Sequence, residues 1–109
     1  MKKDSVYLHH ILDSIEKIET YSRVGRETFM STSHWQDAII RNLEIIGEAV
    51  KRLSEDFKSN NPEIIWRDIA GLRDILIHQY MGVDLNTVWN VIENNLPELK
   101  QVILNNLKS

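Results

Sequence analysis

Apolar residues recur at every third or fourth position over most of this chain, which is the spacing of a helix that buries one face. The first such stripe consists of Leu8, Ile11, Leu12, Ile15 and Ile18. No stretch of the sequence has the alternation of apolar and polar residues that is typical of a strand. The pattern therefore predicts an all-α fold, an up-and-down bundle of four to five helices.

Capping and breaking residues place the first two helices. Asp4 and Ser5 suit an N-cap, so the first helix is expected to run from there to about Arg23. Gly25 should end it, because glycine readily adopts the backbone conformation found after a helix. Residues 31–33, Ser-Thr-Ser, can cap a second helix of about 22 residues.

A third helix is predicted to carry the most informative segment of the chain. Residues 58–62 form a turn cluster, in which Asn61 suits a cap and Pro62 suits the first helical position. The apolar stripe that follows is expected to end between Tyr80 and Gly82.

Asp84 suits the cap of a fourth helix, and Pro97 should kink or restart that helix. With 109 residues, of which 42% are hydrophobic, the chain fits one domain across residues 1–109. The core of so small a domain is thin without a partner, so an oligomer is expected.

Charge and composition limit the function classes. A formal charge of −3 argues against a protein that coats nucleic acid, because that role needs a broad basic surface. There is no cysteine, no apolar run of membrane-spanning length and no apolar signal-peptide core after Met1. A cytoplasmic location is therefore expected. A local basic patch would still allow RNA binding, and its candidates are Arg23, Arg26, Arg41, Lys51, Arg52 and Lys58.

The segment from Gly71 to Tyr80 places Arg73, His78 and Tyr80 among apolar residues. Arg suits phosphate oxygens, His moves protons near neutral pH, and the Tyr hydroxyl can be modified. On a helix Arg73 and Tyr80 share one stripe about 10 Å apart, whereas His78 lies about 140° around from Arg73. Asp74 is four residues before His78 and could hold one imidazole nitrogen. The triplet suggests phosphodiester chemistry.

Cleavage of RNA without a metal or other cofactor needs a base for the 2′-hydroxyl proton, a cation for the charged transition state and an acid for the leaving oxygen. One chain offers one such His, so a composite site at a dimer interface is predicted. The competing interpretation makes Arg73 and His78 an ion pair and a hydrogen-bonded helix-end His, with Tyr80 as a packing residue. No metal role is expected for the other histidines, which lie far from any carboxylate pair at ligand spacing: His9, His10 and His34.

Several other residues are open to two interpretations. Trp35, Trp66 and Trp89 are expected to be core or interface anchors rather than platforms for base stacking. Asn42 and Glu48 are polar residues on a largely apolar helix. They either support the motif helix or make half-buried structural hydrogen bonds.

The sequence resembles the HEPN superfamily, in its HepT-like subgroup of bacterial and archaeal toxins. The family pattern is Arg, a polar residue, three further residues, His, one residue and Tyr, and here it reads Arg73, Asp74, His78 and Tyr80. The resemblance covers nearly the whole chain and also rests on the strings at residues 41–49, 66–73, 82–84, 88–89 and 96–99.

The resemblance implies a homodimeric, metal-independent endoribonuclease toxin with a single HEPN-type domain, and with Arg73 and His78 in a cleft between protomers. It also implies a minimal nucleotidyltransferase antitoxin that transfers AMP from ATP to Tyr80. RNA and this antitoxin are the expected partners. The competing class, which the resemblance also allows, is a non-catalytic helical partner or substrate-binding subunit of a nucleotidyltransferase. A third interpretation, a purely structural dimeric bundle, leaves the motif unexplained.

Overall fold

The computed structural model describes the backbone of residues 2–78 and 84–108, and the side chains of residues 3–72 and 84–108. This part of the chain contains helices and no strand, so the predicted all-α fold is confirmed. In chain order its elements are α1 (Lys2–Ser22), α2 (Arg26–Ser31), α3 (Ser33–Arg52), α4 (Glu55–Asn60), α5 (Trp66–His78), α6 (Leu85–Asn90), the π-helical turn η2 (Val91–Asn95) and α7 (Leu96–Leu107).

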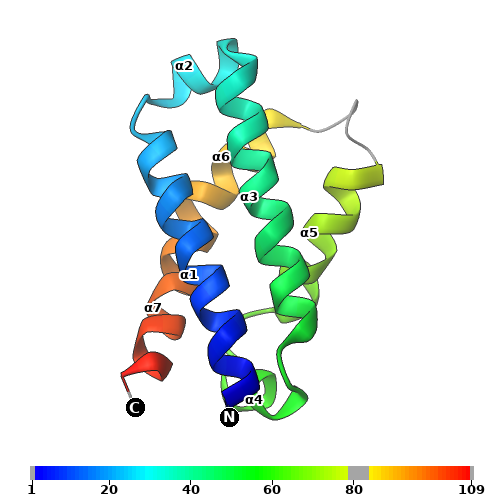
Figure 1. Cartoon of the computed structure of the whole chain (residues 1–109). Coiled ribbons are helices and arrows are strands. Elements are labelled where there is room, and N and C mark those ends of the chain that lie inside the picture. The colour runs from blue at the N-terminus through cyan, green and yellow to red at the C-terminus, as the bar shows by residue number, and fades with distance from the viewer. Residues whose placement is uncertain (1, 79–83, 109) are drawn as a thin grey trace.

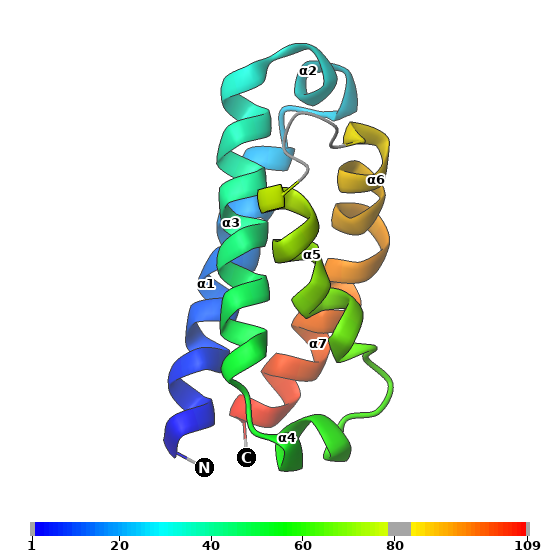
Figure 2. The ribbon, with the colours of Figure 1, turned by 90° about the vertical axis from the view of Figure 1, so that its right-hand side faces the viewer.

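The long helices run side by side along the long axis of the molecule (Figure 1). α1 and α3 form an antiparallel pair, and α3 also packs against α5. α6, η2 and α7 form one further column, which contacts α1. The short helices lie at the two ends of the bundle, with α2 between α1 and α3 and α4 between α3 and α5 (Figures 1 and 2). This arrangement is the predicted up-and-down bundle.

The core consists of the apolar stripes that the sequence predicts. Ile15 of α1 and Leu43 of α3 are fully buried, and burying such a side chain contributes about 1.5–3 kcal/mol. Trp66 and Trp89 are buried as well, which confirms them as core residues, whereas Trp35 is half-buried. Within the described residues, no helix combines the length and apolarity needed to cross a bilayer.

The predicted start of the first helix is wrong. α1 already includes Lys2, so Asp4 lies within its first turn and does not cap it. The Asp4 carboxylate is buried and accepts two hydrogen bonds from Ser54, one from the backbone N–H at 2.8 Å and one from the hydroxyl at 2.6 Å. Asp4 therefore ties the beginning of α1 to the segment between α3 and α4, which is a tertiary role.

The predicted start of the third helix is also wrong. Asn61 is the C-cap of the short helix α4, and α5 begins only at Trp66. The backbone oxygen of Asn61 accepts a hydrogen bond from Nε1 of Trp66 at 3.0 Å, and its side-chain oxygen accepts one from Asn106 at 3.1 Å. The local pattern of the turn cluster does not show the contact with Asn106, because that contact depends on how α7 packs.

Other boundaries agree with the sequence. α1 ends at Ser22, and Gly25 follows with a φ of 92°. The short helix α2 after it has no counterpart among the elements predicted from the sequence. α3 has 20 residues and starts after Thr32, whose side chain makes no capping hydrogen bond.

The Asp84 carboxylate accepts from the N–H of Asn86 at 2.9 Å and so caps α6, as predicted. The helix restarts near Pro97, which lies in the first turn of α7 after the π-helical turn.

Candidate active site at the end of α5

Three of the four motif residues lie on the last turns of α5. The backbone is helical without a break through His78, and this stretch includes Arg73 and Asp74. Tyr80 lies outside the described residues, as does the predicted helix end between Tyr80 and Gly82. The structure thus describes the backbone of Arg73, Asp74 and His78, while the contacts of their side chains remain predictions.

The regular helix constrains how Arg73 and His78 can act together. In an unbroken α-helix residues five apart are separated by about 7.5 Å along the axis and about 140° around it. The backbone keeps its helical form between the two residues and therefore does not turn them toward one point. A site that uses both groups on one phosphate needs either a long reach by the Arg side chain or a second protomer.

α5 lies at the outside of the bundle. Its last turns lie beside the middle of α3 in both ribbon views (Figures 1 and 2). None of the helices described covers the side of α5 that faces the viewer in Figure 2. Among the described residues, this side of α5 is therefore free of a covering helix.

Asn42 makes a structural hydrogen bond within its own helix. It is buried, and its amide nitrogen donates to the backbone oxygen of Ala38 at 2.9 Å. Its side-chain oxygen has no hydrogen-bond partner within the described part of the chain. Asn42 is seven residues after Trp35, so the two share a helical stripe, and the Trp35 ring lies 6.1 Å from that of Tyr21 on α1. Of the two interpretations, structural hydrogen bonding on the side of α1 fits better.

The candidate basic residues do not form one patch. Arg23 and Arg26 lie at the corner between α1 and α2. Arg52 ends α3 at the opposite end of the bundle, where its Nη2 is 3.5 Å from Oε1 of Glu48, and Lys58 follows in α4. Most of the length of α3 therefore separates Arg23 and Arg26 from Arg52 and Lys58. Of these two pairs, the one that includes Arg26 lies near the beginning of α6.

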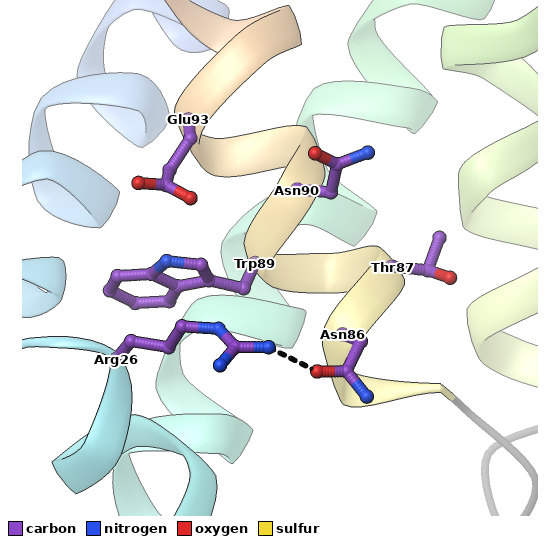
Figure 3. A pocket seen from close by; sticks show the side chains of 6 residues that line it. All are labelled: Arg26, Asn86, Thr87, Trp89, Asn90 and Glu93. Atoms are coloured by element: carbon purple, nitrogen blue, oxygen red, sulfur yellow. Dashed lines mark hydrogen bonds between the residues drawn. The ribbon is translucent and has the colours of Figure 1, made fainter.

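A polar hollow opens between α2 and α6 (Figure 3). It has a volume of about 330 Å³. Nη2 of Arg26 donates to the side-chain oxygen of Asn86, 60 residues farther along the chain. The sequence indicates Arg26 only as a candidate for a basic patch, and no local signal pairs it with Asn86. The lining consists of Arg26, Asn86, Thr87, Trp89, Asn90 and Glu93.

A second hollow, near the start of α5, is acidic. It has a volume of about 140 Å³ and contains the carboxylates of Glu63, Asp68 and Glu98. Ile65, also in its lining, is 62% exposed. Carboxylates repel phosphate, so this end of α5 is unsuited to an RNA backbone.

The described helices define a small all-helical domain, in which the sequence of an outer helix, α5, includes Arg73 and His78. The chain matches the family model described as ribonuclease HepT-like over residues 11–105. This match includes all of α5 and spans the helices that pack around it. The chain therefore belongs to the HepT-like ribonuclease family, which confirms the family indicated by the sequence.

Relatives of similar length support this membership. The chain is 46% identical over 95 residues to a "Probable ribonuclease HepT" of Thermococcus cleftensis, with 86% of each protein covered. It is 40% identical over 104 residues to a "Putative RNase" of Caldanaerobacter subterraneus, with 94% of this chain and 93% of the relative covered.

A longer relative contains a similar segment. A Methanocaldococcus jannaschii protein named "Gamma-glutamylcyclotransferase and putative RNase" is 47% identical over 106 residues. The match covers 95% of this chain but 48% of that protein, so the chain spans about half the length of this relative. No solved structure matches the chain significantly.

Proposed function

We propose that this protein is a metal-independent endoribonuclease that acts as the toxin of a toxin–antitoxin pair. The observation that carries the ribonuclease activity is membership of the HepT-like ribonuclease family over residues 11–105. The names of the relatives from Thermococcus and Caldanaerobacter support the same activity. RNA is then the substrate, and we expect it to be met in the cytoplasm.

In the proposed reaction, His78 takes the proton of a ribose 2′-hydroxyl, and the resulting oxygen attacks the neighbouring phosphorus. Arg73 stabilises the added negative charge on the phosphate oxygens. A protonated imidazole gives its proton to the departing 5′-oxygen as the bond to phosphorus breaks. Asp74, four residues before His78, orients the imidazole. The products are a 2′,3′-cyclic phosphate and a 5′-hydroxyl end.

The acid and the base of this reaction are best supplied by two protomers. Each chain contributes one motif His, and the unbroken helix of α5 does not turn Arg73 and His78 toward one point. The outer side of α5 is left uncovered by the other described helices (Figure 2). A two-fold dimer through this side would place two motif helices across one groove.

Tyr80 is proposed as the site of control. A nucleotidyltransferase antitoxin would transfer AMP from ATP to its hydroxyl, with release of pyrophosphate. On a continued helix Tyr80 shares a stripe with Arg73, so the added phosphate and adenosine would bring negative charge and bulk next to the phosphate-binding group. RNA would then be repelled and blocked.

The test is cleavage of total cellular RNA by the purified protein in the presence of a chelator. Arg73→Ala and His78→Ala should each lower the cleavage rate by at least about 100-fold, because each removes a group that acts only in the transition state. Arg52→Ala and His9→Ala are matched controls on exposed side chains and should retain activity. Circular dichroism checks that all variants keep their helical content.

Full activity in both motif variants would exclude this assignment. The antitoxin is tested by adding the neighbouring nucleotidyltransferase and ATP, which should stop cleavage as AMP is found on Tyr80 by mass spectrometry. An unmodified, folded wild-type dimer that does not cleave RNA would instead support the non-catalytic subunit of a nucleotidyltransferase.

A further inference from the structure

The hollow between α2 and α6 has the composition of a nucleotide-binding surface. Its one cation, Arg26, is exposed, and the hydrogen bond to Asn86 orients the guanidinium (Figure 3). A guanidinium has five N–H donors, so the others can contact phosphate oxygens while one is held by Asn86. Asn86, Asn90 and Glu93 follow one another at steps of four and three residues along one face of the helix.

We propose that this hollow is a second RNA subsite, which holds one nucleotide of the substrate away from the scissile bond. The inference rests on the proposed ribonuclease function and adds to it a binding site on different elements. Arg26 contacts the phosphate, held in place by Asn86. The amide of Asn90 and the carboxylate of Glu93 offer donors and acceptors to the edge of the base.

The lining favours a nucleotide over an apolar protein segment. Trp89 forms part of the wall but is only 8% exposed, because its ring packs against Phe29 with 5.3 Å between ring centroids. The other side chains of the lining are polar or charged. A volume of about 330 Å³ lies at the lower end of the range for small-ligand sites, about 300–1,000 Å³, and suits a single nucleotide unit.

The position of the hollow along the bundle supports the same conclusion. It is lined by residues of α6, the next described element after the motif helix α5. Arg23 and Arg26 are both near this corner, whereas the hollow at the start of α5 contains three carboxylates. The distribution of charge thus directs an RNA backbone from the motif toward Arg26 and away from the other end of α5.

Glu93 lies in the same lining and limits where the phosphate can bind. Figure 3 shows Arg26 and Glu93 on different sides of the Trp89 side chain. A phosphate is therefore expected on the Arg26 side, beside Asn86. The Glu93 side suits a base with an exocyclic amino group, which can donate to a carboxylate.

The experiment measures binding separately from cleavage. A fluorescent single-stranded 2′-O-methyl RNA of twelve nucleotides cannot be cut, because its 2′-oxygen is blocked, and its dissociation constant is measured by fluorescence anisotropy over a series of salt concentrations. Arg26→Ala should weaken binding about tenfold. It should also make the plot of log affinity against log salt shallower by about 0.7, the value for one phosphate contact in single-stranded nucleic acid.

Arg52→Ala is the matched control, since it removes the same charge from the opposite end of α3. The affinity of this variant should stay within about twofold of the wild-type value. Its salt slope should stay within about 0.2 of the wild-type slope. Arg26→Lys keeps the charge but loses the fork of donors, so it should retain the slope and bind about threefold more weakly. Asn86→Ala should weaken binding in the wild-type background but add nothing to Arg26→Ala.

The outcomes separate the two proposals. The subsite is excluded if Arg26→Ala has the affinity and salt slope of wild type, or if its affinity for the RNA falls no further than that of Arg52→Ala. This holds whatever the cleavage assay gives. If wild type binds the RNA through Arg26 but cuts no cleavable RNA, the ribonuclease proposal fails, and the hollow stands as an RNA-binding site with no role in cleavage. Absence of RNA binding by the folded wild-type protein overturns both.

Discussion

Asp4 is the clearest case of a single residue that connects distant parts of the chain. Its carboxylate is 6% exposed and accepts hydrogen bonds from the backbone N–H and the hydroxyl of Ser54. The Ser54 hydroxyl in turn accepts from the N–H of Phe57 at 3.1 Å and caps α4. One carboxylate thus positions both the start of α1 and the start of α4.

We predict that Asp4→Ala lowers the free energy of unfolding by about 2–3 kcal/mol, because it leaves the Ser54 N–H and hydroxyl without their charged acceptor. The matched control is Asp13→Ala, which removes an exposed carboxylate from the same helix and should change stability by about 0.5 kcal/mol or less. Urea denaturation followed by circular dichroism measures both. Equal, small losses in the two variants would contradict the role given to Asp4.

At the scale of elements, the corner between α1 and α2 depends on the backbone of Gly25. Its φ of 92° and ψ of 161° lie in a region that is almost restricted to glycine. A Cβ there would meet no atom within 4 Å, so the restriction is conformational and not steric crowding by neighbours. This corner places Arg26 opposite α6.

Replacement of Gly71 by alanine is expected to change stability in the opposite direction from replacement of Gly25. It lies inside α5, and a Cβ on it would also meet nothing within 4 Å. Gly25→Ala should therefore destabilise the protein by about 1–3 kcal/mol, whereas Gly71→Ala should stabilise it by about 0.5–1 kcal/mol through the higher helix propensity of alanine. Thermal unfolding at one protein concentration measures both changes. A gain in stability for Gly25→Ala would contradict the argument.

The elements also differ in how far the sequence could predict them. Asp84 caps α6 through the N–H of Asn86, two residues away, and such a local contact is visible in the sequence. Asp4 and Asn61 are the same kinds of residue, yet their partners include Ser54 and Asn106, 50 and 45 residues away. A capping residue with a distant partner cannot be distinguished from a true cap by local pattern alone.

At the scale of the whole molecule, the proposed composite site makes a prediction about mixed dimers. If one His78 acts as base and the partner's as acid, a dimer of one wild-type chain and one His78→Ala chain has lost one of the two proton-transfer groups at its site. Such a dimer, purified through a different tag on each chain, should cleave RNA at about 1% or less of the wild-type rate.

The control is a mixed dimer with His9→Ala, which should keep full activity because His9 is an exposed residue of α1. A wild-type/His78→Ala dimer with half the wild-type rate would mean that each chain contains a complete site. Sedimentation at the assay concentration gives the oligomeric state, and a fully active monomer would also contradict the composite site.

The candidate site was predictable only in part. The spacing of Arg73, Asp74 and His78 on one helix follows from the sequence, and α5 does extend through His78. The placement of α5 at the outside of the bundle does not follow from it, nor does the hollow around Arg26. That hollow lies between α6 and α2, which is six residues long. Its two hydrogen-bonded residues, Arg26 and Asn86, are 60 residues apart in the chain.

The sequence by itself determined the all-helical class, the apolar stripes and the capping of α6, because helical periodicity and capping act within a few residues. The tertiary structure decided which distant polar groups meet: Asp4 with Ser54, Asn61 with Asn106, and Arg26 with Asn86. These pairings depend on how the packed helices are aligned along one another. That alignment is set by the fit of all the buried side chains together, which no local stretch of sequence specifies.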